Sequence, residues 1–151
     1  MLHKIWLIGL LSFFHSSCKK QSQNNISGYT VEHIDVRNII DAECRFIRAH
    51  QLNDGAFTMS GERQEKGYKI VPYFNNLAAM ALLENPNDSN MVSVKHWMIW
   101  YFEHLNADGS VFDYYSDKYN GNAVIISSND FDSIDSYAAT FISLCKKLCI
   151  I

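Results

Sequence analysis

Five aspartates near aromatic residues are the side chains of this chain best suited to acid–base chemistry. They are Asp54, Asp108, Asp113, Asp132 and Asp135. Asp113 lies between Phe112 and Tyr114, where desolvation would favour the protonated carboxyl that a general acid needs. Asp54 and Asp108 each precede a glycine and suit turns, and Asp132 suits a helix N-cap. Asp113 and Asp135, the latter in the first turn of an expected helix, are therefore the strongest candidates for chemistry.

A pattern that occurs twice must position these aspartates. Residues 46–57 and 100–112 each read as the end of an apolar helix, an exit with a histidine, an Asp-Gly turn and an aromatic residue. Each copy precedes a second helix with an Ala-Ala pair, beginning at Ala78 and at Ala138, and matching positions lie roughly 54 to 60 residues apart. Such repeats are typical of stacked or toroidal helical architectures. The sequence therefore predicts an all-α fold of two consecutive helical hairpins.

Hydrophobic periodicity places four helices in the folded part. We expect them from residue 31 or 35 to 51, at 72–83, at 92–105, and from about 132 to the last residue. The expected N-caps are Asp35, Ser89 or Asn90, and Asp132, and Pro72 suits a first helical turn. Residues 58–69 are expected to form a loop, and residues 124–126 either a short strand or a loop. The last helix has no exit signal, which favours a fragment of a larger fold.

The first eighteen residues resemble an export signal. A short basic start precedes an uncharged apolar run at 5–14, which is too short to span a bilayer. Small residues then precede Cys18, as in the lipobox of bacterial lipoproteins, although His15 departs from that motif. We expect Cys18 to be lipidated, with a plain secretory signal as the alternative. Residues 19–29 are polar and suit a flexible tether, so the domain is expected at 30–151.

Composition limits the classes of protein that need consideration. The 151 residues provide at most one domain, and a hydrophobic content of 48% is ample for a packed core. The formal net charge of -3 gives no sign of nucleic-acid binding. With Cys18 lipidated, three cysteines remain, an odd number that excludes a fully paired disulfide framework. We interpret Cys145 and Cys149 as small apolar residues, and no motif for a metal or another cofactor is present.

The repeated hairpins, together with Trp97, Trp100 and Tyr101 on one helix and the segment at 132–140, resemble the six-hairpin glycosidase-like (α/α)6 toroid superfamily. The resemblance covers about residues 36–144 and two hairpins of the six. It implies an incomplete (α/α) toroid with catalytic roles for Asp113 and Asp135, since glycoside hydrolysis requires two carboxyl groups. It also implies that aromatic residues bind a glycan, namely Tyr73, Trp100, Tyr114 and Tyr137.

Other roles remain open for several of these residues. Trp97 and Trp100 suit a hydrophobic core as well as a sugar platform. His50 and His104, just before the matching turns, suit a helix C-terminus.

Two functions are compatible with the sequence. In the first, the chain is a cell-envelope lipoprotein related to carbohydrate-active toroid proteins and without robust catalysis. In the second, it is a non-enzymatic helical-repeat module that uses an open apolar face to hold a protein partner or its own copies.

Overall fold

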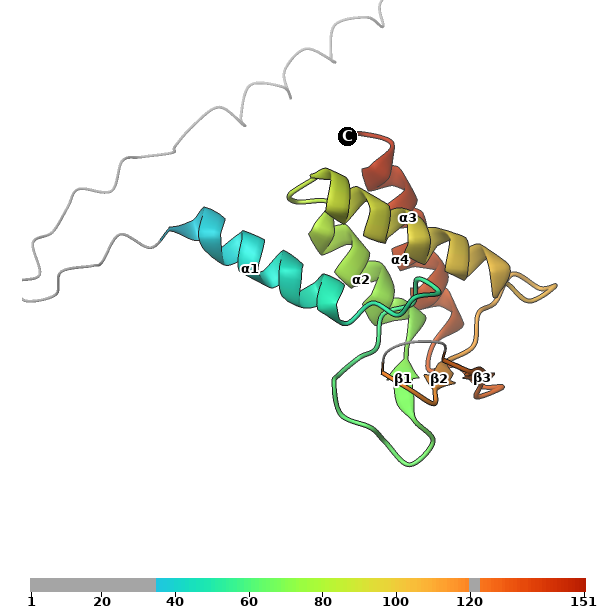
Figure 1. Ribbon diagram of the computed structural model, residues 1–151. Helices are drawn as coiled ribbons and strands as arrows, with labels where there is room; N and C mark the ends of the chain where they lie inside the picture. The colour runs from blue at the N-terminus through green and yellow to red at the C-terminus, as the bar shows by residue number, and fades with distance from the viewer. Residues whose placement is uncertain (1–34, 120–122) are drawn as a thin grey trace, which may run out of the picture. The chain divides into compact units, whose positions relative to one another are not determined.

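The computed structural model describes residues 35–119 and 123–151, and these contain both helices and strands (Figure 1). Four helices surround the core, and three short strands form an antiparallel sheet. The prediction of an all-α fold, an incomplete (α/α) toroid, is therefore wrong: the described part is mixed α and β. The predicted signal at 1–18, with Cys18, and the tether at 19–29 lie outside the described residues.

Helices α1 and α3 precede the two Asp-Gly turns. α1 spans Val36–Ala49, and the carboxylate of Asp35 accepts the backbone N–H groups of Arg37 and Asn38, so the predicted N-cap is confirmed. α3 spans Asp88–Glu103 and begins four residues earlier than predicted. Its N-cap is Asn87, whose side chain accepts the N–H of Asn90, and the prediction of Ser89 or Asn90 as the cap is wrong. The run of turn-forming residues at 85–90 concealed this start.

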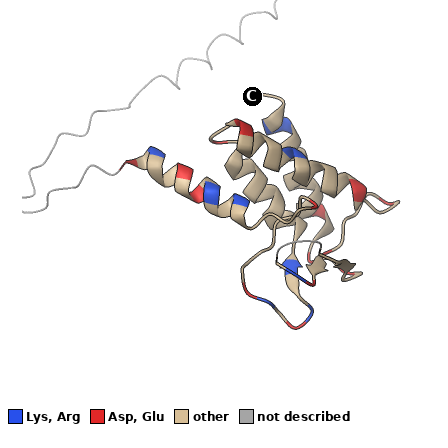
Figure 2. Cartoon of the chain, in the orientation of Figure 1, with Lys and Arg blue, Asp and Glu red and all other residues tan. Residues whose placement is uncertain are grey.

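Helices α2 and α4 follow the strands. α2 spans Pro72–Leu82, and Pro72 occupies the first turn as predicted. α4 spans Ile134–Leu148, with Ser133 rather than Asp132 at the N-cap position. Asp132 does not cap the helix, because its carboxylate lies 3.5 Å from the amine of Lys69. Figure 2 shows charges of both signs along α1 and none on α2, which buries one face that includes Asn75, Ala79 and Leu82.

The sheet has the order β1-β2-β3 with both pairs antiparallel. β1 is Tyr68–Ile70, β2 is Tyr114–Ser116 and β3 is Ile125–Ser127. The short β-like run predicted at 124–126 thus contributes to β3. β1 lies where a loop was predicted, because three residues are too few for an alternating pattern to be recognised. Tyr115 of β2 pairs with Lys69 of β1 and Ile126 of β3, which brings segments far apart in sequence together.

The core lies between the helices and beneath the sheet. α2 packs against α4 and α3, and α1 borders α2 and α3. Trp97 and Trp100 are fully buried and stacked with a centroid separation of 5.1 Å, so the interpretation of these residues as core is confirmed. The rings of Tyr101 and Phe141 stack at 3.8 Å and connect α3 with α4. In Figure 1 the strands lie at the end of the helical layer where α2 and α4 begin.

Candidate functional site

Asp113 is the centre of a buried polar cluster formed by three separate segments. Its Oδ1 accepts a hydrogen bond of 2.7 Å from the hydroxyl of Tyr137 in α4. Its Oδ2 lies 3.0 Å from Nζ of Lys69 in β1. Asp113 itself precedes β2, and its backbone carbonyl accepts from the N–H and the hydroxyl of Ser128. The cluster therefore connects both outer parts of the sheet with the start of α4.

The two donors of this cluster both hold their protons. Burial lowers the pKa of Lys69, but the hydrogen bond to Asp113 and the charges of Asp113 and Asp132 outweigh it, so the pKa is raised overall. Burial raises the pKa of the Tyr137 hydroxyl strongly, and its hydrogen bond to Asp113 adds to this effect. The backbone N–H of Asp132 also donates to this hydroxyl, at 3.1 Å. The carboxylate of Asp113 thus lies between the amine of Lys69 and the hydroxyl of Tyr137, which is the arrangement of a structural ion pair.

The structure does not place the two candidate catalytic carboxyls in the same environment. Asp135 lies in the first turn of α4, as predicted, but its side chain is exposed, whereas Asp113 is buried. Inverting and retaining glycosidases both need two carboxyl groups that face one bond across an open site. The buried ion pair of Asp113 with Lys69 is poorly suited to this task. The catalytic roles of Asp113 and Asp135 stay predictions.

Three of the four predicted sugar-binding aromatics are buried. Trp100, Tyr114 and Tyr137 have at most 8% of their surface exposed. Trp100 stacks on the ring of His104 at 3.8 Å, and its indole N–H donates to Asp54. Tyr73, at the start of α2, is partly exposed and packs edge-on against Phe74 at 5.2 Å. A sugar platform needs an open ring face, so Tyr73 alone among these four offers accessible surface.

The histidines before the two turns occupy equivalent positions. His50 and His104 are the C-cap residues of α1 and α3, as the pattern predicted. Nδ1 of His50 lies 2.9 Å from the carbonyl of Phe46, and Nδ1 of His104 lies 2.7 Å from the carbonyl of Trp100. A carbonyl only accepts, so Nδ1 is the donor in both rings. Each histidine thereby satisfies a carbonyl in the last turn of its helix.

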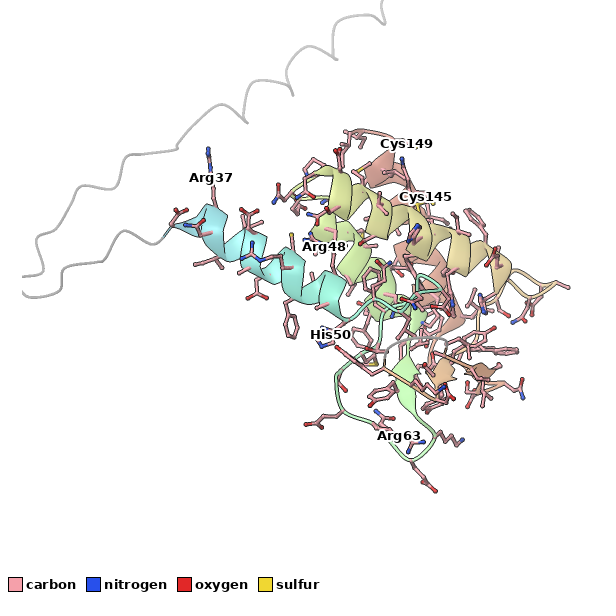
Figure 3. All side chains as sticks on the ribbon, in the orientation of Figure 1. Arg37, Arg48, His50, Arg63, Cys145 and Cys149 are labelled. Atoms are coloured by element: carbon pink, nitrogen blue, oxygen red, sulfur yellow. The ribbon has the colours of Figure 1, made fainter. Side chains whose placement is uncertain are left out.

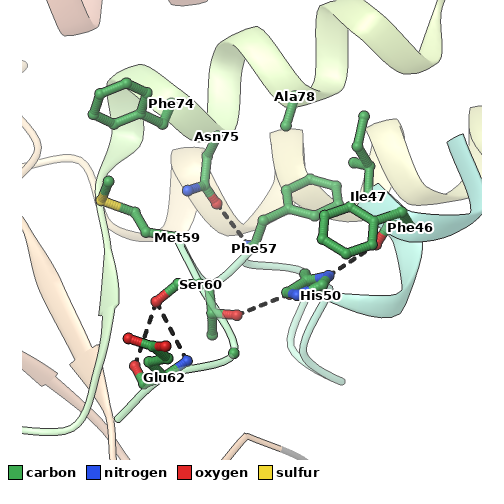
Figure 4. Close-up of a pocket in the computed structure, with 12 residues that line it drawn as sticks. Phe46, Ile47, His50, Phe57, Met59, Ser60, Glu62, Phe74, Asn75 and Ala78 are labelled. Carbon is green, nitrogen blue, oxygen red and sulfur yellow. Dashed lines mark hydrogen bonds between the residues drawn. The ribbon is translucent and has the colours of Figure 1, made fainter. Parts of the chain in front are cut away.

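Next to His50 is a cavity that sequence reasoning missed. It has a volume of about 430 Å³ and lies between the end of α1, the start of α2 and the segment at 57–62 (Figure 4). Phe46, Phe57 and Phe74 supply most of its aromatic surface. These three residues are distant in sequence, and no regular interval between them indicates a shared site. The one available signal is that Phe46 and Phe57 lie on either side of the first Asp-Gly turn.

The cysteines of the described residues are all free. Cys44 is buried in α1, while Cys145 and Cys149 lie one turn apart at the end of α4 (Figure 3). Burial raises the pKa of the Cys145 thiol, and the neighbouring Cys149 adds to this effect. A raised pKa reduces the thiolate fraction, so Cys145 is a poor nucleophile at neutral pH.

Searches against known proteins and structural criteria add two findings. No protein-family model, curated protein or solved structure matches this chain. Across residues 35–119 and 123–151, no three His, Cys, Asp or Glu side chains are grouped to hold a metal ion, and no helix has the length and apolar content to cross a bilayer.

Proposed function

We propose that the described domain is a non-enzymatic binding module that holds an amphipathic segment of another protein against α1. One observation carries the proposal. α1 leaves four large apolar side chains in solvent, with exposed fractions of 59% for Val36, 49% for Ile39, 38% for Ile40 and 61% for Phe46. We call these four residues the α1 stripe. Large apolar side chains exposed together on one helix face mark interaction sites.

The four residues of the α1 stripe lie on one face of the helix and are not scattered around it. Val36, Ile39, Ile40 and Phe46 follow a helical spacing of three, four and ten residues, which places them on one side of α1. Only Cys44 of this helix is buried, on an adjacent side that faces the rest of the domain. Ile47 of the same helix is half-buried against the core, so α1 turns one edge of its apolar face inward and leaves the four residues of the stripe in solvent. A second protein surface would remove this face from water.

The charges on α1 favour a different protein over a second copy of this chain. Glu43 lies seven residues after Val36 and is exposed in line with the stripe. Arg37, Arg45 and Arg48 are turned away from this face by their helical positions, and Arg48 bonds to Asn90. A second copy would bring Glu43 against a stripe without a basic residue to meet it. A partner with a basic residue among its apolar ones avoids this cost.

A peptide selection tests the proposal. The full chain is screened against a displayed library of amphipathic peptides, and we expect enrichment of sequences that combine apolar and basic residues. Ile39→Asp should weaken the binding of selected peptides at least roughly tenfold, because it places a charge in the contact. Ile142→Asp is the matched control, since Ile142 is 67% exposed on α4 and outside the stripe.

Two results would overturn the proposal. One is a selection without enriched peptides, and the other is binding that Ile39→Asp leaves intact. Light scattering of the purified chain decides between partners. A stable dimer that Ile39→Asp converts to monomer would show that a second copy occupies the stripe instead.

The glycan-related activity stays a prediction that can be tested directly. Asp113→Asn and Asp135→Asn are compared with the unmodified chain in a hydrolysis screen over a glycan panel. We expect no turnover by any of the three proteins. Clear turnover that either substitution abolishes would show an enzyme and contradict the proposed binding role.

We also propose that the chain is exported and anchored to a bacterial membrane through Cys18. The support is the apolar run at 5–14 followed by small residues and a cysteine. Expressed in a bacterium with labelled fatty acid, the unmodified chain should carry label in the membrane fraction. Cys18→Ala should lose both the label and the membrane association. Retention of the label by Cys18→Ala would contradict the anchor.

A further inference from the structure

The cavity beside α1 is continuous with the α1 stripe, because Phe46 belongs to both. Its volume of about 430 Å³ falls within the range of roughly 300–1,000 Å³ that is typical of ligand pockets. Ile47, Phe57 and Ala78 line it together with the exposed rings of Phe46 and Phe74. A segment bound along α1 can therefore insert a large apolar side chain into the cavity at the C-terminal end of the helix.

Most polar atoms at the cavity are already engaged within the domain. Oδ1 of Asn75 accepts the N–H of Phe57 at 2.6 Å, and its Nδ2 donates to the carbonyl of Val71 at 3.0 Å. The hydroxyl of Ser60 accepts the N–H of Glu62 and donates to the carbonyl of Glu62. These groups hold the wall of the cavity in place, as Figure 4 shows, and leave little capacity for a ligand.

Two acceptors remain available at the rim. Because Nδ1 of His50 donates to the carbonyl of Phe46, Nε2 is the ring nitrogen that can accept a hydrogen bond. This Nε2 faces the loop, since a side chain added at Gly61 would meet it at 3.9 Å. The second acceptor is the carboxylate of Glu62, an exposed residue that lines the cavity. Both groups, like Glu43 on the stripe, favour a donor with positive charge.

We infer that the cavity is an anchor site for a large apolar side chain of the bound segment, with a lysine or arginine next to it that faces Glu62 and His50. This inference rests on the proposed function and specifies its partner. The apolar residue fills the space between Phe46, Phe57 and Phe74. The basic residue meets the two acceptors of the rim and gives the contact its orientation. An acidic residue at the same place meets the carboxylate of Glu62 and is rejected.

Three synthetic peptides test the inference. They share one amphipathic sequence with a leucine anchor and differ only in the residue next to it, which is lysine, glutamine or glutamate. Binding to the full chain is measured by fluorescence anisotropy. We expect the lysine peptide to bind roughly tenfold more tightly than the glutamate peptide. Glu62→Gln should reduce this ratio to about twofold or less, and Glu65→Gln, an exposed carboxylate outside the cavity, should leave it unchanged.

A second variant tests the anchor without changing charge. Ala78→Leu fills the cavity and should weaken all three peptides by a similar factor of about five or more. Ala139→Leu, at an exposed position of α4, is its matched control. Circular dichroism confirms that each variant folds, and Glu62→Gln keeps the test valid if Ala78→Leu does not.

The outcomes separate the inference from the function on which it rests. In one outcome, Ile39→Asp abolishes peptide binding, but the peptides show no preference for lysine and do not respond to Glu62→Gln or Ala78→Leu. This outcome would overturn the anchor site and leave the proposed binding module intact. Absence of binding by any peptide would overturn both.

Discussion

The turn at 50–56 and the turn at 104–110 have the same backbone hydrogen bonds, yet the helices that lead into them are buried to different extents. In the first turn, the N–H of Leu52 donates to Ala56 and that of Gly55 to Leu52. In the second, Asn106 donates to Ser110 and Gly109 to Asn106, with distances that differ by no more than 0.1 Å between copies. The shared His and Asp-Gly positions of the two segments have produced the same local structure.

The packing around the turns is different. Phe46 and Trp100 are equivalent, each packed on the histidine four residues later, at 4.4 Å and 3.8 Å. Phe46 is 61% exposed, whereas Trp100 is 1% exposed. α3 also contacts β2 through Trp100 and Tyr114 and α4 through Tyr101 and Phe141. Among the described residues, the helix neighbours of α1 are α2 and α3. The comparison teaches that the repeat determines how a side chain is held locally, and that the neighbouring elements determine whether it is buried.

The largest expected effect comes from the two equivalent aromatic residues. Trp100→Ala should lower the free energy of unfolding by about 3–5 kcal/mol, because it leaves a cavity in the core. Phe46→Ala should lower it by only about 0.5 kcal/mol, as is usual for exposed positions. Denaturant unfolding followed by circular dichroism measures both. Equal losses would show that the local stacking on histidine, and not burial, stabilises these positions.

The next effect distinguishes the two glycines. Gly55 and Gly109 both have positive φ, at 106° and 83°, so alanine is strained at either place. A Cβ at Gly55 would lie 2.5 Å from the backbone oxygen of His96, and a Cβ at Gly109 would meet nothing within 4 Å. Gly55→Ala should therefore cost about 3 kcal/mol and Gly109→Ala about 1 kcal/mol in unfolding experiments. A larger loss for Gly109→Ala would contradict the packing of the first turn against α3.

Met59 and Asp113, each three residues beyond the matching Ala56 and Ser110, provide a third comparison. The N–H groups of Met59 and Asp113 both pair with a distant carbonyl, that of Lys69 and that of Asp130. Asp113→Ala should lower the free energy of unfolding by about 2 kcal/mol, because Lys69 and Tyr137 lose their acceptor.

Met59→Ala is the control for this substitution. Met59 is exposed, so its loss should change the free energy of unfolding by less than about 1 kcal/mol. A neutral Asp113→Ala would show that the buried cluster contributes nothing to stability.

The smallest effect concerns pH. Hydrogen bonds from the hydroxyl and the N–H of Ser110 lower the pKa of Asp108 below its usual value of 3.8. Because the pKa of Asp108 is lower in the folded than in the unfolded chain, its ionised carboxylate stabilises the fold at a pH above the unfolded pKa. This contribution disappears as the pH falls through the pKa of Asp108 in the folded chain. The difference in stability between the unmodified chain and Asp108→Ala should therefore shrink from pH 7 to pH 3. A difference that is constant over this range would contradict the hydrogen bonds to Ser110.

The helices were predictable because each carries its own signals. Asp35 and Pro72 mark the starts of α1 and α2, and the periodic apolar residues give the extent of each helix within a few residues. The start of α3 was predicted four residues too late, since Asn87, Ser89 and Asn90 are all good caps and only the surrounding packing selects one. The sequence indicated only the region of β3, and β1 and β2 were missed, because each strand has three residues and depends on partners from distant segments.

The cluster around Asp113 was predictable only in part. Its neighbours Phe112 and Tyr114 indicated a carboxyl among aromatic residues, and the structure places it beside Tyr137, another residue selected from the sequence. Lys69 was missed, because it lies 44 positions away in a segment read as a loop. Its role follows from the pairing of β1 with β2, which no local pattern encodes. The cavity beside α1 was missed for the same reason.

The local features follow from the sequence alone: the caps at Asp35, His50 and His104, the two Asp-Gly turns, and the limits of α2. These depend on backbone conformation and on hydrogen bonds between residues close in the chain. Tertiary structure decided the rest: the sheet, the ion pair of Lys69 with Asp113, the burial of Trp100 and the exposure of Phe46. Each of these depends on which elements become neighbours, and burial is a property of the neighbours and not of the residue.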